Sequence, residues 1–313
     1  MTAGTSVRAA PRPGPATPPR TRVARVRAAR TAGRLGPLAP AVVLLLVFMA
    51  APVGFAVYYS FTNTALTGVG ASGASFVGFS NFTRMFSDPI FRESLILTVI
   101  FTVGSGVIGQ NTLGLLLALL MRGRNGAFRS VLGTIIVAAW VVPEIVAAFI
   151  WYAYLNDQGS LNAVLSALHL PHPEWLYVYP MISVIVANIW RGTAFSMLVY
   201  SAAISNLPTD VLEAAAVDGA TPLQRLWRVT LPLMRRSIMT NLMLVTLQTL
   251  SVFTLIFALT GGGPGDASET LPIYMYQEAF KFYQLGYGAA MTLVLLAIGA
   301  IFSLIYVRVL KVD

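Results

Sequence analysis

Cysteine is absent from this chain of 313 residues, and charged residues make up only 11% of it. The absence of cysteine excludes disulfide bonds, thiolate metal sites and a cysteine nucleophile. A soluble globular domain carries about 25% charged residues, so the deficit indicates that most of this chain does not face water. Apolar residues make up 56% of the sequence. This length and composition suit about five to seven membrane-spanning helices of about 20 residues each.

Lysine is scarce as well, and Lys281 and Lys311 are the only two. Neither lies in a Gly-x-x-x-x-Gly-Lys-Ser/Thr phosphate loop, so the chain cannot bind ATP in that manner. The sequence also offers no Ser–His–Asp arrangement and no cluster of acids and histidines that would indicate an enzyme. We therefore expect a protein without catalytic residues and without a cofactor of its own.

Two histidines, His169 and His172, lie close to Glu174. This spacing raises the question of a metal site, because zinc is bound by such side chains. The neighbouring Pro171 and Pro173 favour an outer turn instead. Two histidines without further ligands are typical of a loop, so we predict no metal site.

Positive charge is concentrated at the start of the chain. The net charge is +9, and the first 34 residues hold Arg8, Arg12, Arg20, Arg22, Arg25, Arg27, Arg30 and Arg34. The same stretch is rich in Pro, Ala, Gly and Thr, which predicts a disordered cytoplasmic tail over residues 1–36. No aromatic or fold signal accompanies the arginines, so nucleic acid is not an expected partner, whereas contact with anionic lipid is compatible with the tail.

Six apolar segments follow the tail. They cover approximately residues 38–61, 94–121, 131–155, 176–205, 237–260 and 283–307. Each is long enough to cross a hydrocarbon core of about 30 Å at about 1.5 Å per residue, and continuous apolar runs exclude alternating strands. The first run is too long for a signal-peptide core. We therefore expect residues 37–313 to form an all-α integral membrane protein with six transmembrane helices.

The basic residues between these segments predict the orientation of the bundle. With the N-terminus in the cytoplasm, only Arg84, Arg92 and Lys281 fall on the outer side. Apart from Arg191, which lies within the fourth segment, every other basic residue falls on the inner side. This asymmetry follows the positive-inside rule, so both termini are predicted to be cytoplasmic.

The cytoplasmic connection between the fourth and fifth segments contains strong helix signals. Pro208 and Gly219 bracket a first short helix, because proline suits a first turn and glycine a left-handed stop. Thr221 and Gln224 form a capping box at the start of a second helix, and Pro232 is expected to end it. The pattern predicts a compact helix–turn–helix.

Two interpretations of this hairpin, residues 206–232, are open on its residues alone. Its first helix carries three alanines after Glu213. Such a small-residue surface can dock into a groove on a partner protein, with Glu213 available for an arginine there. The alternative is an amphipathic loop that lies on the bilayer surface.

The hairpin also carries a family motif. The run Glu213-Ala214-Ala215, followed by Gly219 and by Val229-Thr230-Leu231-Pro232, resembles the EAA loop of permease subunits in binding-protein-dependent ABC importers. The family pattern has isoleucine where this chain has Val229, and often proline where it has Arg236. The second departure leaves the start of the fifth helix open.

Three further stretches resemble the same family. Asp218-Gly219-Ala220 is similar to the DGA that follows the EAA motif. Residues 259–265, which read LTGGGPG, resemble the turn after the fifth span in the carbohydrate-uptake branch, which contains maltose and glycerol-phosphate permeases. Residues 77–82 resemble the segment that precedes the second span. The resemblance therefore extends over approximately residues 38–310.

The resemblance implies partners and a mechanism. Related permeases work as a pair of similar subunits with two cytoplasmic ATPases that bind ATP and Mg, and an extracytoplasmic solute-binding protein delivers the solute. By position, contact with the ATPase falls on Glu213, Ala214, Ala215, Asp218 and Gly219. The expected protein is an importer subunit in the bacterial plasma membrane for a sugar or sugar-like solute. Glycerol phosphate or another polar solute is the alternative.

Charges within spans are candidates for a solute pathway. Glu144 follows Pro143 in the third segment, where a proline is expected to kink the helix. Arg191 lies midway in the fourth segment beside Trp190. In one interpretation Arg191 donates hydrogen bonds to the solute and Trp190 stacks against a sugar ring. In the other, the two charges satisfy each other or backbone carbonyls. Gln248 in the fifth segment is a weaker candidate.

Other polar or small residues within the segments indicate helix packing. A lone amide such as Asn241 more often bonds a neighbouring helix, for about 1 kcal/mol. Ser105 and Gly109, four residues apart, are also interpreted as packing positions. A self-sufficient secondary transporter is a further alternative, but it predicts an inverted repeat or several paired intramembrane charges, and the sequence shows neither.

Overall fold

The computed structural model describes residues 39–311, and the tail predicted for residues 1–36 lies outside them. The described residues divide into two units at Phe55, residues 39–55 and residues 56–311. Over the described residues the regular structure is helical, apart from one isolated bridge between Thr62 and Phe76. The predicted all-helical architecture is confirmed for this part of the chain.

The first apolar segment forms a helix without a break. It consists of α2 (Ala39–Leu45), the π-helical turn η2 (Leu46–Ala50) and α3 (Ala51–Ser60). Over its most apolar 18 residues this 22-residue helix has a mean hydropathy of 2.4, and almost all of its side chains are exposed. A helix that is apolar all round and not covered by protein is typical of a membrane span.

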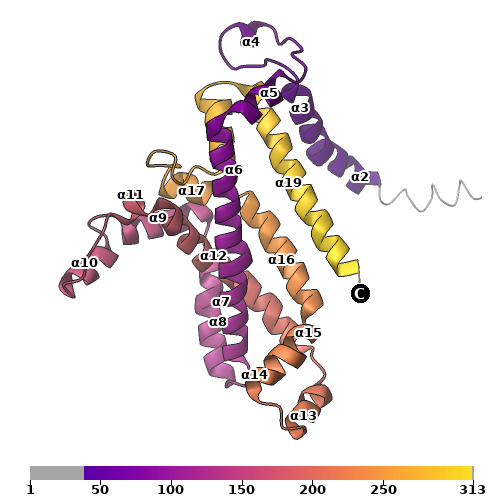
Figure 1. Cartoon of the computed structure of the whole chain (residues 1–313), viewed down its shortest axis with the longest axis vertical. Coiled ribbons are helices and arrows are strands. Elements are labelled where there is room, and N and C mark those ends of the chain that lie inside the picture. Colours follow the sequence, from indigo (N-terminus) through magenta and orange to yellow (C-terminus); the bar gives the residue numbers. More distant parts are fainter. Residues whose placement is uncertain (1–38, 312–313) are drawn as a thin grey trace, which may run out of the picture. The chain divides into compact units, whose positions relative to one another are not determined.

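The second long helix runs from Pro89 to Met121, through α6 (Pro89–Phe101), π-helical η3 (Thr102–Gln110) and α7 (Asn111–Met121) (Figure 1). It follows the short helices α4 (Val69–Ser72) and α5 (Ser80–Ser87). It begins earlier than predicted because the Asp88 side chain accepts the N–H of Ile90 and Pro89 occupies the first position. The charged residues just before the predicted segment therefore belong to its first turns.

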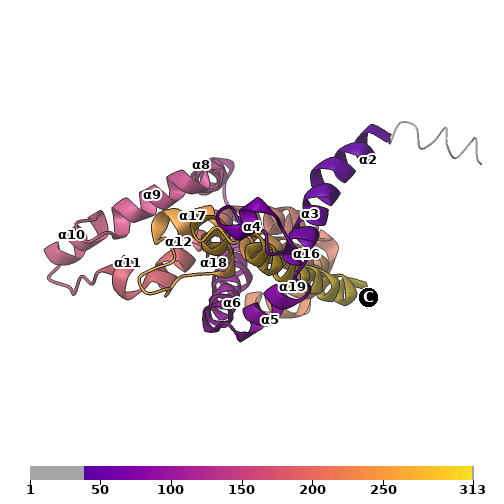
Figure 2. The ribbon, with the colours of Figure 1, turned by 90° about the horizontal axis from the view of Figure 1, so that it is seen from above.

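The third predicted span is a corner rather than one helix. α8 (Gly126–Val141) ends before Pro143, and α9 (Glu144–Leu155) with α10 (Ser160–Ala167) leaves at an angle of 104° (Figures 1 and 2). Proline supplies no N–H and keeps the preceding residue out of the helical region. The sequence indicated a kink at Pro143, but the single helix predicted over residues 131–155 is wrong.

The fourth and sixth predicted spans are continuous helices. α12 (Pro180–Ser205) follows the short α11 (Trp175–Val178), and α19 (Leu285–Lys311) ends the described chain. α12 packs against η3, α7 and α8 and is therefore the central helix of unit 2. The segment predicted over residues 176–205 thus contains α12 and most of α11, and the segment predicted over residues 283–307 lies within 283–311 and is helical from Leu285.

The fifth predicted span is interrupted as well. α16 (Arg235–Leu250) is followed by a break and by the short α17 (Thr254–Leu259), α18 (Leu271–Tyr276) and π-helical η5 (Gln277–Lys281). At the break the Ser251 hydroxyl donates to the carbonyl of Gln248 at 3.1 Å, and such local bonds compete with continued helix. A helix over residues 237–260 was expected, and the structure corrects it.

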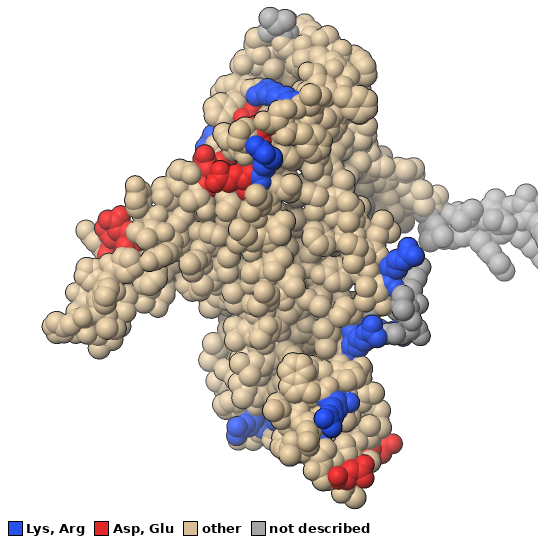
Figure 3. All heavy atoms as spheres, in the orientation of Figure 1, with Lys and Arg blue, Asp and Glu red and all other residues tan. Residues whose placement is uncertain are grey.

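Four helices in the described residues are long and apolar enough to cross a membrane, or five if the bent pair α8 with α9–α10 counts as one span. The sequence predicted six spans, and the one missing from this count is the fifth segment, which is interrupted after Leu250. Figure 3 shows a broad surface over the long helices that carries no Lys, Arg, Asp or Glu. Such a surface suits a lipid environment, in which charged side chains are costly.

A polar cluster fastens the second long helix to the last one. Asp88 accepts hydrogen bonds from the hydroxyls of Tyr274 in α18 and Tyr287 in α19. The guanidinium carbon of Arg84 lies 4.1 Å from the centre of the Tyr287 ring, and an Arg84 nitrogen lies 3.8 Å from the Glu278 carboxylate. These contacts join α5 and the start of α6 to α18, η5 and the start of α19.

Candidate functional site

A cavity of about 310 Å³ lies where the α8–α9 corner, the middle of α12 and the end of α16 meet. It brings together three of the four residues that the sequence proposed for a solute pathway: Glu144, Arg191 and Gln248. The other lining residues are Gln110, Trp140, Asn188, Gly192, Phe195, Thr249, Ser251 and Val252. The lining thus combines an ion pair, three amides and two hydroxyls with two aromatic rings.

The two intramembrane charges face each other across this cavity. An Arg191 Nη lies 3.1 Å from a Glu144 carboxylate oxygen, and the side chains are 23% and 31% exposed. The pair forms because Glu144 stands in the first turn of α9, directly after the corner, and Arg191 stands midway in α12. The interpretation that the two charges satisfy each other is therefore realised, while both also line the cavity.

The Arg191 guanidinium is only partly used. Its Nε is buried and has no hydrogen-bond partner within the described residues. A buried N–H without a partner costs roughly 1 to 3 kcal/mol. The recorded ion pair is made by an Nη atom, and it leaves Nε unsatisfied.

Both helix interruptions open onto the same cavity. The corner at Pro143 contributes Glu144, and the break after Leu250 contributes Ser251 and Val252. Irregular backbone at membrane depth is tolerated only where it is buried in protein or lines a water-filled space. Two interruptions of the helices thus coincide with one cavity that has a largely polar lining.

Trp190, the fourth candidate, does not line this cavity. Its ring packs edge-on against Trp151 with centroids 6.0 Å apart. The aromatic side chains that do line the cavity are Trp140 of α8 and Phe195 of α12, whose centroids are 5.9 Å apart. The tryptophan that lines the cavity is therefore Trp140 and not Trp190.

Sequence reasoning did not identify the amides at the floor of the cavity. The side-chain amide of Gln110 donates to the backbone carbonyl of Asn188 at 3.1 Å, and Asn188 donates to Ser105 at 2.8 Å. Gly192 makes this approach possible, because a Cβ there would collide with the Gln110 side chain. The spacing of Asn188, Gly192 and Phe195 on one face of α12 was a readable signal.

The packing residues behave as expected. Asn241 donates to Asn111 at 2.8 Å and to Ser196 at 2.9 Å, and so joins α16 to α7 and α12. Gly109 lies against Ile189 of α12 with no room for a side chain. The interpretation of Asn241 and Gly109 as helix-packing residues is confirmed.

The predicted hairpin folds largely as its local signals indicate. α13 (Thr209–Val217) is followed by Gly219, whose φ of +78° is left-handed. The Thr221–Gln224 capping box then begins α14 (Pro222–Arg225). Pro208 lies just before α13 rather than in its first turn. The second helix continues through η4 (Leu226–Thr230) and α15 (Leu231–Leu233).

Pro232 does not end this second helix, contrary to expectation. It occupies one of the first positions of α15, and the helix breaks only at Met234. The missing N–H of a proline is harmless at such a position, and the π-helical turn before it shifts the bonding pattern. α16 therefore begins at Arg235, which settles the start of the fifth segment.

The residues assigned to ATPase contact lie together on the surface of the hairpin. Glu213, Ala214, Asp218 and Gly219 are exposed and Ala215 is half-buried. Large apolar side chains beside them are also exposed, with Val217 at 87% and Leu223 and Trp227 both at 64%. A polar and apolar surface of this kind suits contact with another protein.

No group of three or more His, Asp or Glu side chains in residues 39–311 is arranged to hold a metal ion. His169 stands in a left-handed conformation, with φ 56°, after α10. The pair of histidines therefore belongs to the connection between α10 and α11.

Comparison with known proteins assigns the family. Residues 110–311 match the model of the "Binding-protein-dependent transport system inner membrane component" family. The chain is 34% identical to the sulfoquinovosyl glycerol transport system permease SmoG of Agrobacterium fabrum over 88% of its length and 89% of that protein. It is also 34% identical to the trehalose/maltose transport system permease MalF of Thermococcus litoralis, covering 75% and 79%.

The fold agrees with this assignment. A chain from the crystal structure of a bacterial alginate ABC transporter in complex with an alginate-bound periplasmic protein matches with a TM-score of 0.76. The match is 22% identical and covers 90% of this chain and 98% of the other. Family members are transport components without a catalytic site, and partner ATPases bind the ATP. The chain therefore belongs to the binding-protein-dependent transport system inner membrane components and is a multi-pass permease subunit of an ABC importer.

Proposed function

We propose that this permease forms half of the translocation pathway for a sugar or sugar-like solute, and that the solute passes through the cavity at Glu144, Arg191 and Gln248. The names of the two relatives above refer to sugars or sugar derivatives. The observation that carries the proposal is the ion pair itself, which lines one cavity with several amides and hydroxyls. Ionisable groups inside membrane proteins usually mark such pathways.

The ion pair favours an uncharged solute over glycerol phosphate. Glu144 already balances the charge of Arg191 at 3.1 Å, so an anion would have to displace the carboxylate or lie beside it. A sugar hydroxyl is both donor and acceptor and can bond the guanidinium and the carboxylate at once. The amide of Gln248 offers the same pair of functions. The cavity is thus matched to a polyhydroxylated, neutral surface.

The hairpin has a separate role in this proposal. Its exposed residues Glu213, Ala214, Ala215, Asp218 and Gly219 contact an ATPase subunit, and a second permease subunit with its own hairpin completes the pathway. The exposed apolar side chains on the hairpin support a protein partner rather than water as their environment. The extracytoplasmic binding protein delivers the solute from the opposite side.

Six crossings with both termini in the cytoplasm complete the proposed topology. The corner α8–α9 and the interrupted α16–α17 would each serve as one crossing, with the irregular backbone turned to the cavity. The asymmetry of the arginines supports this orientation. Because the sequence contains no cysteine, single cysteines introduced at residues 124 and 158 can test this topology. A membrane-impermeant thiol reagent is expected to reach the two positions from opposite sides of the membrane.

The solute class is tested in two steps. A thermal-shift screen of the cognate binding protein against neutral sugars and glycerol phosphate identifies the solute, and neutral sugars are expected to bind. Uptake of that solute by the reconstituted transporter is then measured for Arg191→Gln and Glu144→Gln, with Arg92→Gln as a control outside the cavity. Loss of uptake in the first two only supports the proposal. Equal uptake by all three variants, or a binding protein that takes only phosphorylated solutes, contradicts it.

A further inference from the structure

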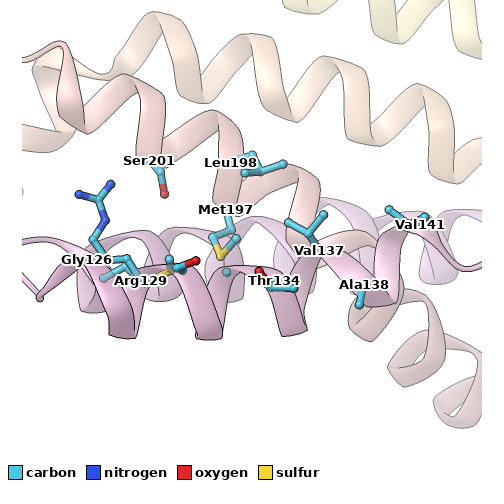
Figure 4. A pocket seen from close by; sticks show the side chains of 12 residues that line it. Gly126, Arg129, Thr134, Val137, Ala138, Val141, Met197, Leu198 and Ser201 are labelled. Carbon is cyan, nitrogen blue, oxygen red and sulfur yellow. The ribbon is translucent and has the colours of Figure 1, made fainter.

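A second, larger cavity lies along the same two helices, α8 and α12, and its residues Val141 and Leu198 are close in sequence to Glu144 and Phe195 of the first cavity. It is a groove of about 780 Å³ between α8 and α12 (Figure 4). Small residues open it: a Cβ on Gly126 would meet no atom within 4 Å, and a Cβ on Gly133 would meet only the Met121 methyl at 3.5 Å. Its walls are mainly aliphatic, with Val137, Val141 and Leu198 among them.

The groove has the length of a lipid chain. Arg129 and Ser201 lie at one end of it and Val141 at the other (Figure 4). Arg129 and Val141 are separated along one helix, α8, which rises about 1.5 Å per residue. The groove therefore extends for roughly 18 Å, somewhat more than half of a hydrocarbon core of about 30 Å.

The arginine end of the groove continues into a smaller cavity of about 230 Å³. The two share Met121, Arg129 and Ser201, and the smaller one adds Arg122 together with the hydroxyl residues Ser205 and Thr209. No acidic residue lines either cavity, and neither arginine has a carboxylate within 4.0 Å in the described chain. Two uncompensated guanidiniums and several hydroxyls are a suitable environment for a phosphate group.

We propose that the groove and its basic end bind one anionic glycerophospholipid. An acyl chain lies along α8 and α12, and the phosphodiester lies between Arg122 and Arg129. An apolar slot that ends in a basic pocket between transmembrane helices is the arrangement that recognises anionic headgroups. An apolar helix from another subunit would fill the groove but would leave both arginines uncompensated, so charge favours the lipid.

The bound lipid would also touch the hairpin. Thr209 and Leu212 of α13 line the smaller cavity, so the headgroup lies against the start of the hairpin's first helix. The lipid therefore bridges the bundle and the hairpin. This inference does not depend on which solute the importer carries.

The test uses the purified full-length chain in detergent. Binding of added dioleoyl phosphatidylglycerol and of dioleoyl phosphatidylcholine is titrated by native mass spectrometry. Phosphatidylglycerol is expected to bind more tightly. Arg122→Gln and Arg129→Gln should each weaken it about fivefold, the effect of one basic residue near an anionic surface. Arg124→Gln, an exposed arginine outside both cavities, is the matched control and should leave the affinity unchanged.

A second pair of variants tests the groove itself. Thr134→Phe places a ring in the groove and should weaken phosphatidylglycerol binding, whereas Ile135→Phe, at a 63% exposed position outside it, should not. Equal affinity for the two lipids, or an unchanged affinity in the Arg122→Gln/Arg129→Gln variant, overturns the proposal. So does full competition by inorganic phosphate, which would show an ion site without a lipid. Loss of the second permease subunit from the assembled transporter in Thr134→Phe, with lipid binding unchanged, would show a protein interface instead.

Discussion

The hairpin and the central cavity are built in opposite ways. The helices of the hairpin lie in one continuous stretch, residues 209–233, and local bonds such as the Thr221–Gln224 capping box stabilise them. Several apolar side chains of this stretch are exposed. The cavity draws its lining from separate helices and encloses its polar groups. An exposed continuous surface suits a protein partner, and an enclosed convergent one suits a small molecule. Substitutions in the two regions should therefore impair different steps of transport.

The largest effect is expected in the hairpin. Glu213→Lys reverses a charge on an exposed surface, and like charges across a protein interface cost several kcal/mol. We expect uptake to fall by about a hundredfold or more, while the protein remains inserted and ATP hydrolysis becomes independent of solute. Simultaneous assays of hydrolysis and uptake in proteoliposomes measure this. Glu93→Lys, at another exposed glutamate, is the matched control, and normal transport by Glu213→Lys would remove the hairpin from the coupling mechanism.

Gly219→Trp is a second route to the same outcome. Gly219 has φ +78° and open space around its α-carbon, so the bundle does not need to move, but the side chain projects into the proposed contact surface. Gly219→Ala separates strain from obstruction, since a left-handed alanine costs only about 1 kcal/mol. Transport should be lost in the first variant and largely retained in the second.

Substitutions of the ion pair in the cavity should have smaller effects, and their effects on stability should not be additive. Arg191→Gln or Glu144→Gln leaves one partly buried charge unpaired, and we expect each to destabilise the protein by about 1 to 2 kcal/mol, less than for a fully buried pair. The double variant should be less harmful than the sum of the two, by about 0.5 to 3 kcal/mol. Thermal unfolding of the four proteins completes the cycle. Strict additivity would show that the 3.1 Å contact contributes nothing.

Two amide side chains on α16 distinguish a role in helix packing from a role in solute transport. Asn241 is buried and bonds two other helices, whereas Gln248 is exposed in the cavity. Asn241→Leu should lower stability by about 1 to 2 kcal/mol with proportionate loss of folded protein. Gln248→Leu should leave the melting temperature unchanged and slow uptake. The reverse pattern would exchange the roles of the two residues.

The smallest effect distinguishes the two tryptophans. Trp140→Phe reduces an aromatic surface that lines the cavity, and a loss of about 0.5 to 1 kcal/mol should slow uptake by severalfold at limiting solute. Trp190→Phe, outside the cavity, should leave uptake close to that of the unaltered protein. Initial uptake rates suffice. A larger effect at Trp190 would restore the stacking role that the sequence suggested.

These regions also differ in how far the sequence predicts them. The hairpin was predictable because its signals are local: a glycine stop at Gly219, a capping box at Thr221, and a family motif that runs from Glu213 to Pro232. The error at Pro232 arose because a proline two residues before a break is compatible with either ending or continuing a helix. The long apolar helices were likewise predictable from hydropathy.

The interruptions and the cavity partners were not predictable in the same way. Pro143 indicated a kink, but hydropathy does not report an angle, so the 104° corner was missed. The break at Ser251 has no proline or glycine to mark it. The contact between Gln110 and Gly192 joins helices that are distant in sequence, and a residue pair of this kind becomes visible only when the helices are placed side by side.

Trp227 gives this permease a built-in optical signal. Its indole is 64% exposed on the second helix of the hairpin, and indole emission moves to shorter wavelength when water is excluded. The chain has five tryptophans, so replacing the other four with phenylalanine would leave one fluorophore, on the surface proposed to contact the ATPase. Each cycle of engagement could then be followed in real time without an attached dye.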